Sequence, residues 1–165
     1  HEHWVNDDGS EIAIVTPRSG EITVSFGIDI GSTSTKATFL DRDNQVVGWI
    51  YRKTAGNPIR AVQLLFKAAR EMEAKGGFHF DIKGVGTTGS GRKMIGELSG
   101  ADRAMNGITA HATAAVFIDP GADTIIALVC EDAKVTQLQN GMVYNSLINY
   151  VCAAGTGSFI EEQSL

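Results

Sequence analysis

The chain has 165 residues, which is enough for one complete hydrophobic core, or for one domain and part of a second. It is 43% hydrophobic and 20% charged, as a globular protein is, and no apolar run is long enough to span a membrane. The net charge of −5, without a basic stripe, argues against nucleic acid as a partner. Two cysteines, Cys130 and Cys152, do not make a disulfide framework. They indicate a reducing compartment, so we expect a cytoplasmic protein.

Residues 1–23 are polar and rich in turn residues, and we expect a linker or run-in with a short strand near Ile12 and Ile14. Residues 24–41 then predict a strand, a tight polar turn and a second strand. Val24, Phe26 and Ile28 alternate with polar residues, and apolar residues return after Lys36.

The turn between these strands is the most informative stretch of the sequence. Its small residues 31–35, Gly-Ser-Thr-Ser-Thr, expose backbone N–H groups and hydroxyls that suit a phosphate. Asp29 lies beside the turn, where a carboxylate near phosphates is tolerable mainly with a metal ion or water between them. Lys36 adds a positive charge. An ordinary hairpin is the alternative. The longer pattern Asp-x-Gly-Ser-Thr-x-x-Lys favours a nucleotide-phosphate hairpin and is neither a Walker loop nor a dinucleotide fingerprint.

The following residues predict an α/β layer. A third strand is expected at 45–51, and an amphipathic helix should run from Pro58 to the glycines at 76–77. A strand at 80–85 should return parallel to the first, because a helix intervenes. The Gly/Thr-rich stretch 86–92 after it is either a ligand loop at a strand end or a flexible connection.

After helices at 91–97 and 106–117, the turn 119–121 is the best internal boundary. Strands are then predicted at 124–130, 134–139 and 142–150, with Asn140-Gly141 as a type I′ hairpin turn. Both halves therefore open with three strands in succession. We expect a first lobe over 24–120 and the incomplete start of a second lobe over 121–165.

A cysteine leads into a Gly-rich helix start at 150–159. Small residues leave room there for a close ligand, which makes Gly155, Thr156 and Gly157 candidate cofactor-binding residues. The positive end of a helix would favour the thiolate of Cys152. A buried structural cysteine is the alternative.

Several motifs together carry a resemblance to a known family. They are Asp-Ile-Gly-Ser-Thr-x-x-Lys at 29–36, Ile-Thr-Ala-His-Ala at 108–112, Asp-Ala-Lys at 132–134 and Cys-Ala-Ala-Gly-Thr-Gly at 152–157. In this order they resemble the BadF/BadG/BcrA/BcrD-type ATPases, activators of 2-hydroxyacyl-CoA dehydratases and relatives in benzoyl-CoA reductases. The resemblance covers about residues 24–165. It implies an α/β fold: a ribonuclease H-like, actin-like ATPase lobe with a mixed five-stranded sheet, and the start of a second similar lobe.

The resemblance also implies chemistry. Gly31, Ser32, Thr33 and Lys36 would hold ATP phosphates, while Asp29 and Asp132 would position Mg²⁺ and the attacking water. Cys152 would ligate a four-iron four-sulfur cluster (4Fe-4S) shared between two subunits. ATP hydrolysis would then drive a low-potential electron to a 2-hydroxyacyl-CoA dehydratase or related reductase. The partner subunit would be an identical chain or an intramolecular repeat.

The sequence departs from the family's pattern in three places. The family's second phosphate hairpin reads Ile-Gly-Gly-Gln-Asp, but residues 128–132 here are Leu-Val-Cys-Glu-Asp, which removes both glycines. Gly107 stands where the family usually has Glu, and the second cluster cysteine would lie beyond Leu165. We therefore expect this chain alone to turn over ATP poorly. The alternatives are a degenerate, non-catalytic interaction module, and a sugar or metabolite kinase of the same superfamily.

Overall fold

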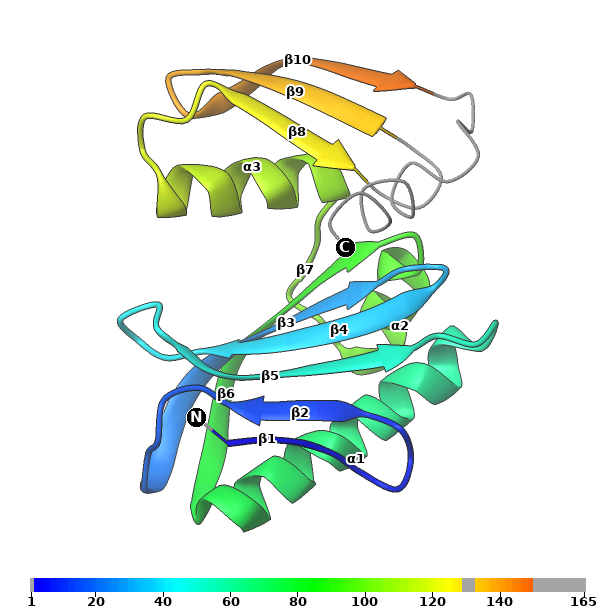
Figure 1. Cartoon of the computed structure of the whole chain (residues 1–165), viewed down its shortest axis with the longest axis vertical. Coiled ribbons are helices and arrows are strands. Elements are labelled where there is room, and N and C mark those ends of the chain that lie inside the picture. The colour runs from blue at the N-terminus through cyan, green and yellow to red at the C-terminus, as the bar shows by residue number, and fades with distance from the viewer. Residues whose placement is uncertain (1, 129–132, 150–165) are drawn as a thin grey trace, which may run out of the picture. The chain divides into compact units, whose positions relative to one another are not determined.

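The computed structural model describes residues 2–128 and 133–149, and the chain divides into two compact units, residues 1–106 (unit 1) and 107–165 (unit 2) (Figure 1). This division falls before helix α3 (Gly107–Ile118), whereas the sequence pointed to the turn after it. The physical reason is packing, since α3 contacts the three strands that follow it.

Unit 1 is built on a mixed sheet, which has seven strands in the described part of the chain. Their order across the sheet is β1 (Glu2–Val5), β2 (Glu11–Ile14), β5 (Val46–Lys53), β4 (Ser34–Leu40), β3 (Gly20–Ile30), β6 (Phe78–Gly89) and β7 (Arg103–Ala104). β6 runs parallel to β3, as predicted, and β7 runs parallel to β6. The other neighbours are antiparallel.

The sheet is wider than the five strands expected from the resemblance. Residues 1–23, expected as a linker with one short strand near Ile12 and Ile14, contain that strand as β2 and also β1 and the start of β3. Ile12 and Ile14 are buried because β2 pairs with β5, a partner far along the chain. The short β7 widens the opposite edge. The turn between β1 and β2 is also bonded to helix α1 (Pro58–Gly76). The ammonium of Lys67, on this helix, lies 2.6 Å from a carboxylate oxygen of Asp8, and this hydrogen bond lowers the pKa of Asp8.

Helix α1 (Pro58–Gly76) begins and ends where its sequence directs. The side chain of Asn57 accepts a hydrogen bond from the Arg60 amide at 2.9 Å, and Pro58 occupies the first turn, where no N–H is needed. Gly77 closes the helix in the left-handed conformation, with φ 67°. Its buried face covers one side of the sheet and consists of Ala61, Val62, Leu65, Ala68, Ala69 and Met72.

The core of unit 1 lies between this side of the sheet and helices α1 and α2 (Arg92–Ser99). Alternate residues of β3 point into it, and the rings of Phe39 stack on Phe26 and Phe80, with centroids 4.6 and 4.2 Å apart. The intervening β3 residues, including Asp29, point to the opposite side of the sheet. The core therefore fixes β3 firmly while leaving its polar side available.

Unit 2 contains α3 and the antiparallel strands β8 (Thr124–Leu128), β9 (Ala133–Gln139) and β10 (Met142–Asn149). The predicted type I′ turn is confirmed: Asn140 and Gly141 have φ of 52° and 74°. The α3 side of this sheet buries Thr136 and Leu138. None of the helices in the described residues is long and apolar enough to cross a membrane.

Candidate functional site

Residues 31–33 connect β3 to β4 in a tight turn. The Gly31 amide donates a hydrogen bond to the Ser34 carbonyl at 3.0 Å, which closes the turn. A Cβ on Gly31 would stand 2.8 Å from that same carbonyl oxygen, a distance that real Cβ atoms essentially never show. The requirement for glycine here therefore comes from the lack of space for a side chain. It does not come from the backbone conformation, since Gly31 does not have a positive φ.

Thr54, which follows β5, holds this turn from one side. Its hydroxyl donates to the Gly31 carbonyl at 2.8 Å and lies 2.9 Å from the Thr35 hydroxyl, and its amide donates to the Thr33 carbonyl at 2.8 Å. Thr35 and Thr54 are both buried. Sequence reasoning missed Thr54, because nothing local marks a threonine at a strand end as the partner of a loop 23 residues away.

The amides at the tip of the turn remain available. Ser32 and Thr33 are exposed, and within the described residues their N–H groups form no hydrogen bond with another part of the protein. The carbonyls of Gly31 and Thr33 are already engaged by Thr54. The turn therefore presents two exposed donors and has two of its three carbonyls occupied, which is a polarity that suits an anion.

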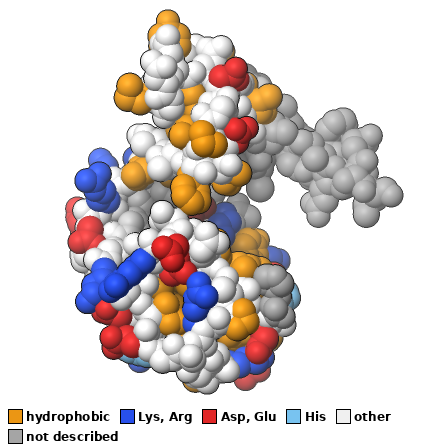
Figure 2. Space-filling model, turned by 90° about the vertical axis from the view of Figure 1, so that its left-hand side faces the viewer, with side chains coloured by type: hydrophobic (Ala, Val, Ile, Leu, Met, Phe, Trp, Pro, Cys, Tyr) orange, Lys and Arg blue, Asp and Glu red, His pale blue; other side chains and the backbone are white. Residues whose placement is uncertain are grey.

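Asp29 and Lys36 face each other directly across β3 and β4. The Lys36 ammonium lies 3.3 Å from Asp29 Oδ2, and the two side chains are 44% and 40% exposed. Acidic and basic groups are interleaved on the unit 1 face that Figure 2 shows. A half-exposed pair of this kind contributes little to stability, about 0–1 kcal/mol, so separating the two charges to bind a ligand costs little.

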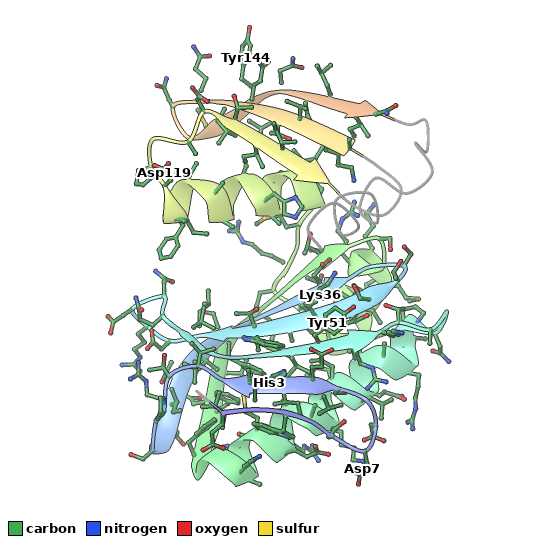
Figure 3. All side chains as sticks on the ribbon, viewed as in Figure 1. His3, Asp7, Lys36, Tyr51, Asp119 and Tyr144 are labelled. Atoms are coloured by element: carbon green, nitrogen blue, oxygen red, sulfur yellow. The ribbon has the colours of Figure 1, made fainter. Side chains whose placement is uncertain are left out.

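The pair belongs to a polar row that crosses five strands. Strand register places Glu11, Tyr51, Lys36, Asp29 and Thr88 side by side, on β2, β5, β4, β3 and β6 respectively. Figure 3 labels Lys36 and Tyr51 on their neighbouring strands. An open depression of about 470 Å³ lies over the β2–β5–β4 part of the row, lined by Glu11, Lys36, Ala37, Thr38, Trp49, Ile50 and Tyr51.

Thr88, beside Asp29, has an unusual hydroxyl. Its Oγ1 is buried and has no hydrogen-bond partner in the described part of the chain, and such orphans are uncommon in folded proteins. A bound oxygen ligand would satisfy it. The described residues hold no group of three or more His, Cys, Asp or Glu side chains that could enclose a metal. One carboxylate next to phosphate oxygens and water is nevertheless the ligand set that Mg²⁺ commonly takes, so Asp29 fits Mg²⁺ delivered with a nucleotide.

Five of the predicted site residues thus come together in unit 1: Asp29, Gly31, Ser32, Thr33 and Lys36. The other predicted residues lie outside the described residues. They are Asp132, Cys152, Gly155, Thr156 and Gly157. Cys130, the other cysteine, also lies outside them.

The sheet order and the turn between β3 and β4 define the class of protein. They form a lobe of the actin-like ATPase fold, an α/β fold with a mixed sheet. The chain belongs to the BadF/BadG/BcrA/BcrD ATPase family, whose model matches residues 26–164.

Its relatives include activators of dehydratases. It is 37% identical over 144 residues to the 2-hydroxyisocaproyl-CoA dehydratase activator of Clostridioides difficile, covering 83% of this chain and 50% of that protein. It is 31% identical over 141 residues to the (R)-2-hydroxyglutaryl-CoA dehydratase activating ATPase of Acidaminococcus fermentans, with 83% and 51% covered. The chain therefore spans about half the length of the curated relatives it matches.

Solved structures of relatives from the same two species also resemble this chain. Component A of the A. fermentans dehydratase superposes with a TM-score of 0.65 at 30% identity, covering 84% of this chain and 52% of that one. The C. difficile activator, solved with bound ADPNP, gives 0.63 at 34% identity, with 86% and 51% covered. The ethanolamine utilization protein EutJ of Carboxydothermus hydrogenoformans, at 15% identity and a TM-score of 0.60, shares the fold; it covers 92% of this chain and 59% of that one.

Proposed function

We propose that unit 1 binds the phosphates of ATP at the 31–33 turn, as the nucleotide-binding part of an ATPase. The observation that carries this proposal is the pair of unengaged, exposed amides at Ser32 and Thr33 in a turn whose Gly31 and Thr33 carbonyls are held by Thr54. Lys36 would neutralise phosphate charge, and Gly31 keeps the turn tight enough for the amides to converge. The ADPNP-bound structure of the C. difficile activator supports a nucleotide as the ligand.

Asp29 would hold Mg²⁺ at these phosphates and orient the attacking water. Mg²⁺, when bound, neutralises charge on the phosphate oxygens. Asp29 is suited to the task because it is half-exposed and lies next to the turn, and the unpaired Thr88 hydroxyl can donate to an oxygen ligand beside it. Asp132 would complete the metal site by the family resemblance.

We further propose that the parent protein activates a 2-hydroxyacyl-CoA dehydratase or related reductase by ATP-driven, low-potential electron transfer, in a reducing cytoplasm. The names of its relatives support this partner. Cys152 would ligate a 4Fe-4S cluster shared with an identical or repeated chain, and Gly155, Thr156 and Gly157 would line the nucleotide's approach. The role of Cys152 rests on the family resemblance, and that of residues 155–157 on the room that small residues leave for a close ligand.

A non-catalytic interaction module is the second candidate. It is favoured by the sequence at 128–132, which carries Glu131 and none of the family's glycines at the second phosphate hairpin. Binding without turnover would then be retained in unit 1 alone.

Calorimetric titration with a non-hydrolysable ATP analogue and Mg²⁺ tests the central proposal. We expect saturable binding to the 165-residue chain and at least tenfold weaker binding to Lys36→Met, because a charge-assisted phosphate contact contributes roughly 1.5–3 kcal/mol. Lys83→Met is the matched control, since Lys83 makes an exposed pair with Asp81 at 2.9 Å on β6. Equal affinity of all three proteins, or no binding at all, would refute the proposal.

The finer roles need separate measurements. Anaerobic reconstitution with iron and sulfide should give a cluster spectrum that is lost in Cys152→Ser and kept in Cys130→Ser. ATP hydrolysis by the chain then separates the two candidate functions: turnover supports the ATPase, whereas tight binding without turnover, at any Mg²⁺ concentration, supports the interaction module.

A further inference from the structure

The carboxyl end of β6 packs so closely against Asp29 that no side chain fits between them. Gly89, the last residue of β6, is the register partner of Ile30 and has φ of 87°. A Cβ at this position would stand 2.4 Å from the Ile30 carbonyl oxygen and 2.6 Å from Asp29 Oδ1. Any side chain here would displace the end of β3 or the carboxylate of Asp29.

The turn that follows is fixed in place by its own hydrogen bonds. The guanidinium of Arg92 donates to the Gly89 carbonyl at 3.0 Å, and the Thr87 hydroxyl donates to the Arg92 carbonyl at 2.9 Å. The Gly91 amide donates to the Ile30 carbonyl at 3.1 Å. The turn is therefore tied both to itself and to β3, and Gly89 cannot retreat from Asp29 without breaking these bonds.

Asp29 is thus bounded at both of its carboxylate oxygens. Oδ2 lies 3.3 Å from the Lys36 ammonium, and Oδ1 faces the bare Cα of Gly89. Gly89 has no side chain to offer a ligand, so any influence on the site passes through Asp29. Sequence reasoning marked residues 86–92 as a ligand loop or a flexible connection, but residues 86–89 are strand and the turn is short and tied.

We propose that Gly89 is a positioning residue for Asp29: it sets the direction in which the carboxylate meets a Mg²⁺ ion that arrives with the nucleotide. This inference rests on the proposed function of Asp29. Of the two groups that a Cβ at Gly89 would meet, the proposal assigns the displacement to the Asp29 carboxylate and not to the end of β3, which leads to the Ser32 and Thr33 amides. The Mg²⁺-dependent part of nucleotide affinity should therefore fall by roughly 10–100-fold, as for other groups that orient metal ligands, while Mg²⁺-free binding changes little.

The main experiment titrates a non-hydrolysable ATP analogue, with and without Mg²⁺, into the 165-residue chain and its variants. Gly86→Ala is the matched control, because Gly86 lies on the same strand and a Cβ there would meet nothing within 4 Å. Gly89→Ala also strains a positive φ, so its melting temperature falls whatever its role. The decisive comparison is therefore made in an Asp29→Asn background.

If Gly89 acts through Asp29, Gly89→Ala costs no further Mg²⁺-dependent affinity once Asp29→Asn is present. Additive losses in the double variant, or equal losses with and without Mg²⁺, would overturn the proposal and leave Gly89 a structural residue.

A second measurement needs no nucleotide. The side-chain carboxyl carbon resonance of Asp29, followed by NMR in the free protein, should shift in Gly89→Ala and stay in place in Gly86→Ala. An unmoved resonance overturns the positioning role even if nucleotide binds. Conversely, a shifted resonance in a protein that shows no nucleotide binding would overturn the proposed function and leave only the packing of Gly89 against Asp29.

Discussion

Two hairpins of this chain make their turns in opposite ways. In unit 2, β9 and β10 are joined by Asn140-Gly141, where two positive φ values turn the chain within two residues. In unit 1, β3 and β4 are joined by residues 31–33, where no residue has a positive φ. That turn is held instead by the hydroxyl of Thr54. The first turn is determined locally, and the second depends on contacts with distant residues.

This difference determines which of the two turns can offer oriented hydrogen-bond donors to a ligand. A type I′ turn needs only its own two residues, and it tolerates solvent around them. The 31–33 turn is held through its Gly31 and Thr33 carbonyls by Thr54, which is remote in sequence, and this leaves the amides of Ser32 and Thr33 unengaged. Donors that are already oriented need little reorganisation when an anion binds.

Replacing Gly31 should give the largest effect. In Gly31→Ala the new Cβ clashes with the Ser34 carbonyl, 2.8 Å away, so the turn must open and its amides diverge. We expect nucleotide affinity to fall roughly ten- to a hundredfold, the loss of one or two charge-assisted hydrogen bonds. Calorimetry measures it. The matched control is Gly27→Ala on β3, the strand that leads into the turn, because its Cβ would have only an ordinary contact at 4.0 Å. An equal loss there would contradict the account.

Removing the hydrogen bond from the Thr54 hydroxyl to the turn should give the second-largest effect. Thr54→Val keeps the shape but deprives the Gly31 carbonyl of its partner, at a cost of about 1–3 kcal/mol in unfolding free energy, and should weaken nucleotide binding several-fold. Thr136→Val is the comparable change in unit 2, where the buried hydroxyl lies 3.3 Å from Ser146. It should lower stability without altering affinity. If Thr54→Val left affinity unchanged, the turn would not depend on this contact.

A substitution in the Asn140-Gly141 turn of unit 2 should lower stability without changing nucleotide affinity. Gly141→Ala places a side chain at φ 74° and should destabilise the β9–β10 hairpin by about 1–2 kcal/mol. Hydrogen exchange at β9 and β10 amides would report the loss. Nucleotide affinity should stay the same, since the amides of Ser32 and Thr33 lie in unit 1 and the substituted turn follows β9, whereas Asp132 precedes it. A parallel fall in affinity would remove the distinction between the two hairpins.

The smallest expected effect is a change in melting temperature that depends on pH, and it concerns a third hairpin. Between β4 and β5, Asp41 accepts hydrogen bonds from the Gln45 and Asp43 amides and pairs with Arg18, which lowers its pKa. The lowered pKa means that this stabilisation is complete above the unfolded-state pKa of about 3.9 and is lost as pH falls through the folded-state value. Asp41→Asn should thus melt slightly earlier than wild type at pH 7, with the gap closing below about pH 4. A gap that persisted in acid would contradict this.

Much of the fold could be predicted because its signals are local. The signals are the alternation in β3, Pro58 at the start of α1 and the Asn140-Gly141 turn. Each acts within a few residues, and all three predictions match the structure. The short strand expected near Ile12 and Ile14 is β2. The edge strands β1 and β7 were not predicted, because each is a strand through its pairing with a neighbour, β1 with β2 and β7 with β6.

The candidate site, too, consists of residues that a local motif predicts and residues that only long-range contacts reveal. Asp29, the turn and Lys36 form a contiguous motif, and register brings them together as the sequence indicated. Thr54 and Gly89 were not assigned to the site, since their roles are contacts with β3 and its turn across 23 and about 60 residues of chain. Their importance is a matter of packing, which no spacing rule encodes.

The most direct test of the central claim follows the backbone amides of the nitrogen-15-labelled chain by NMR during titration with a non-hydrolysable ATP analogue and Mg²⁺. The account predicts that Ser32 and Thr33 shift together along one saturable curve, while Asn140 and Gly141 stay in place. Unmoved Ser32 and Thr33 amides at saturating nucleotide would contradict it.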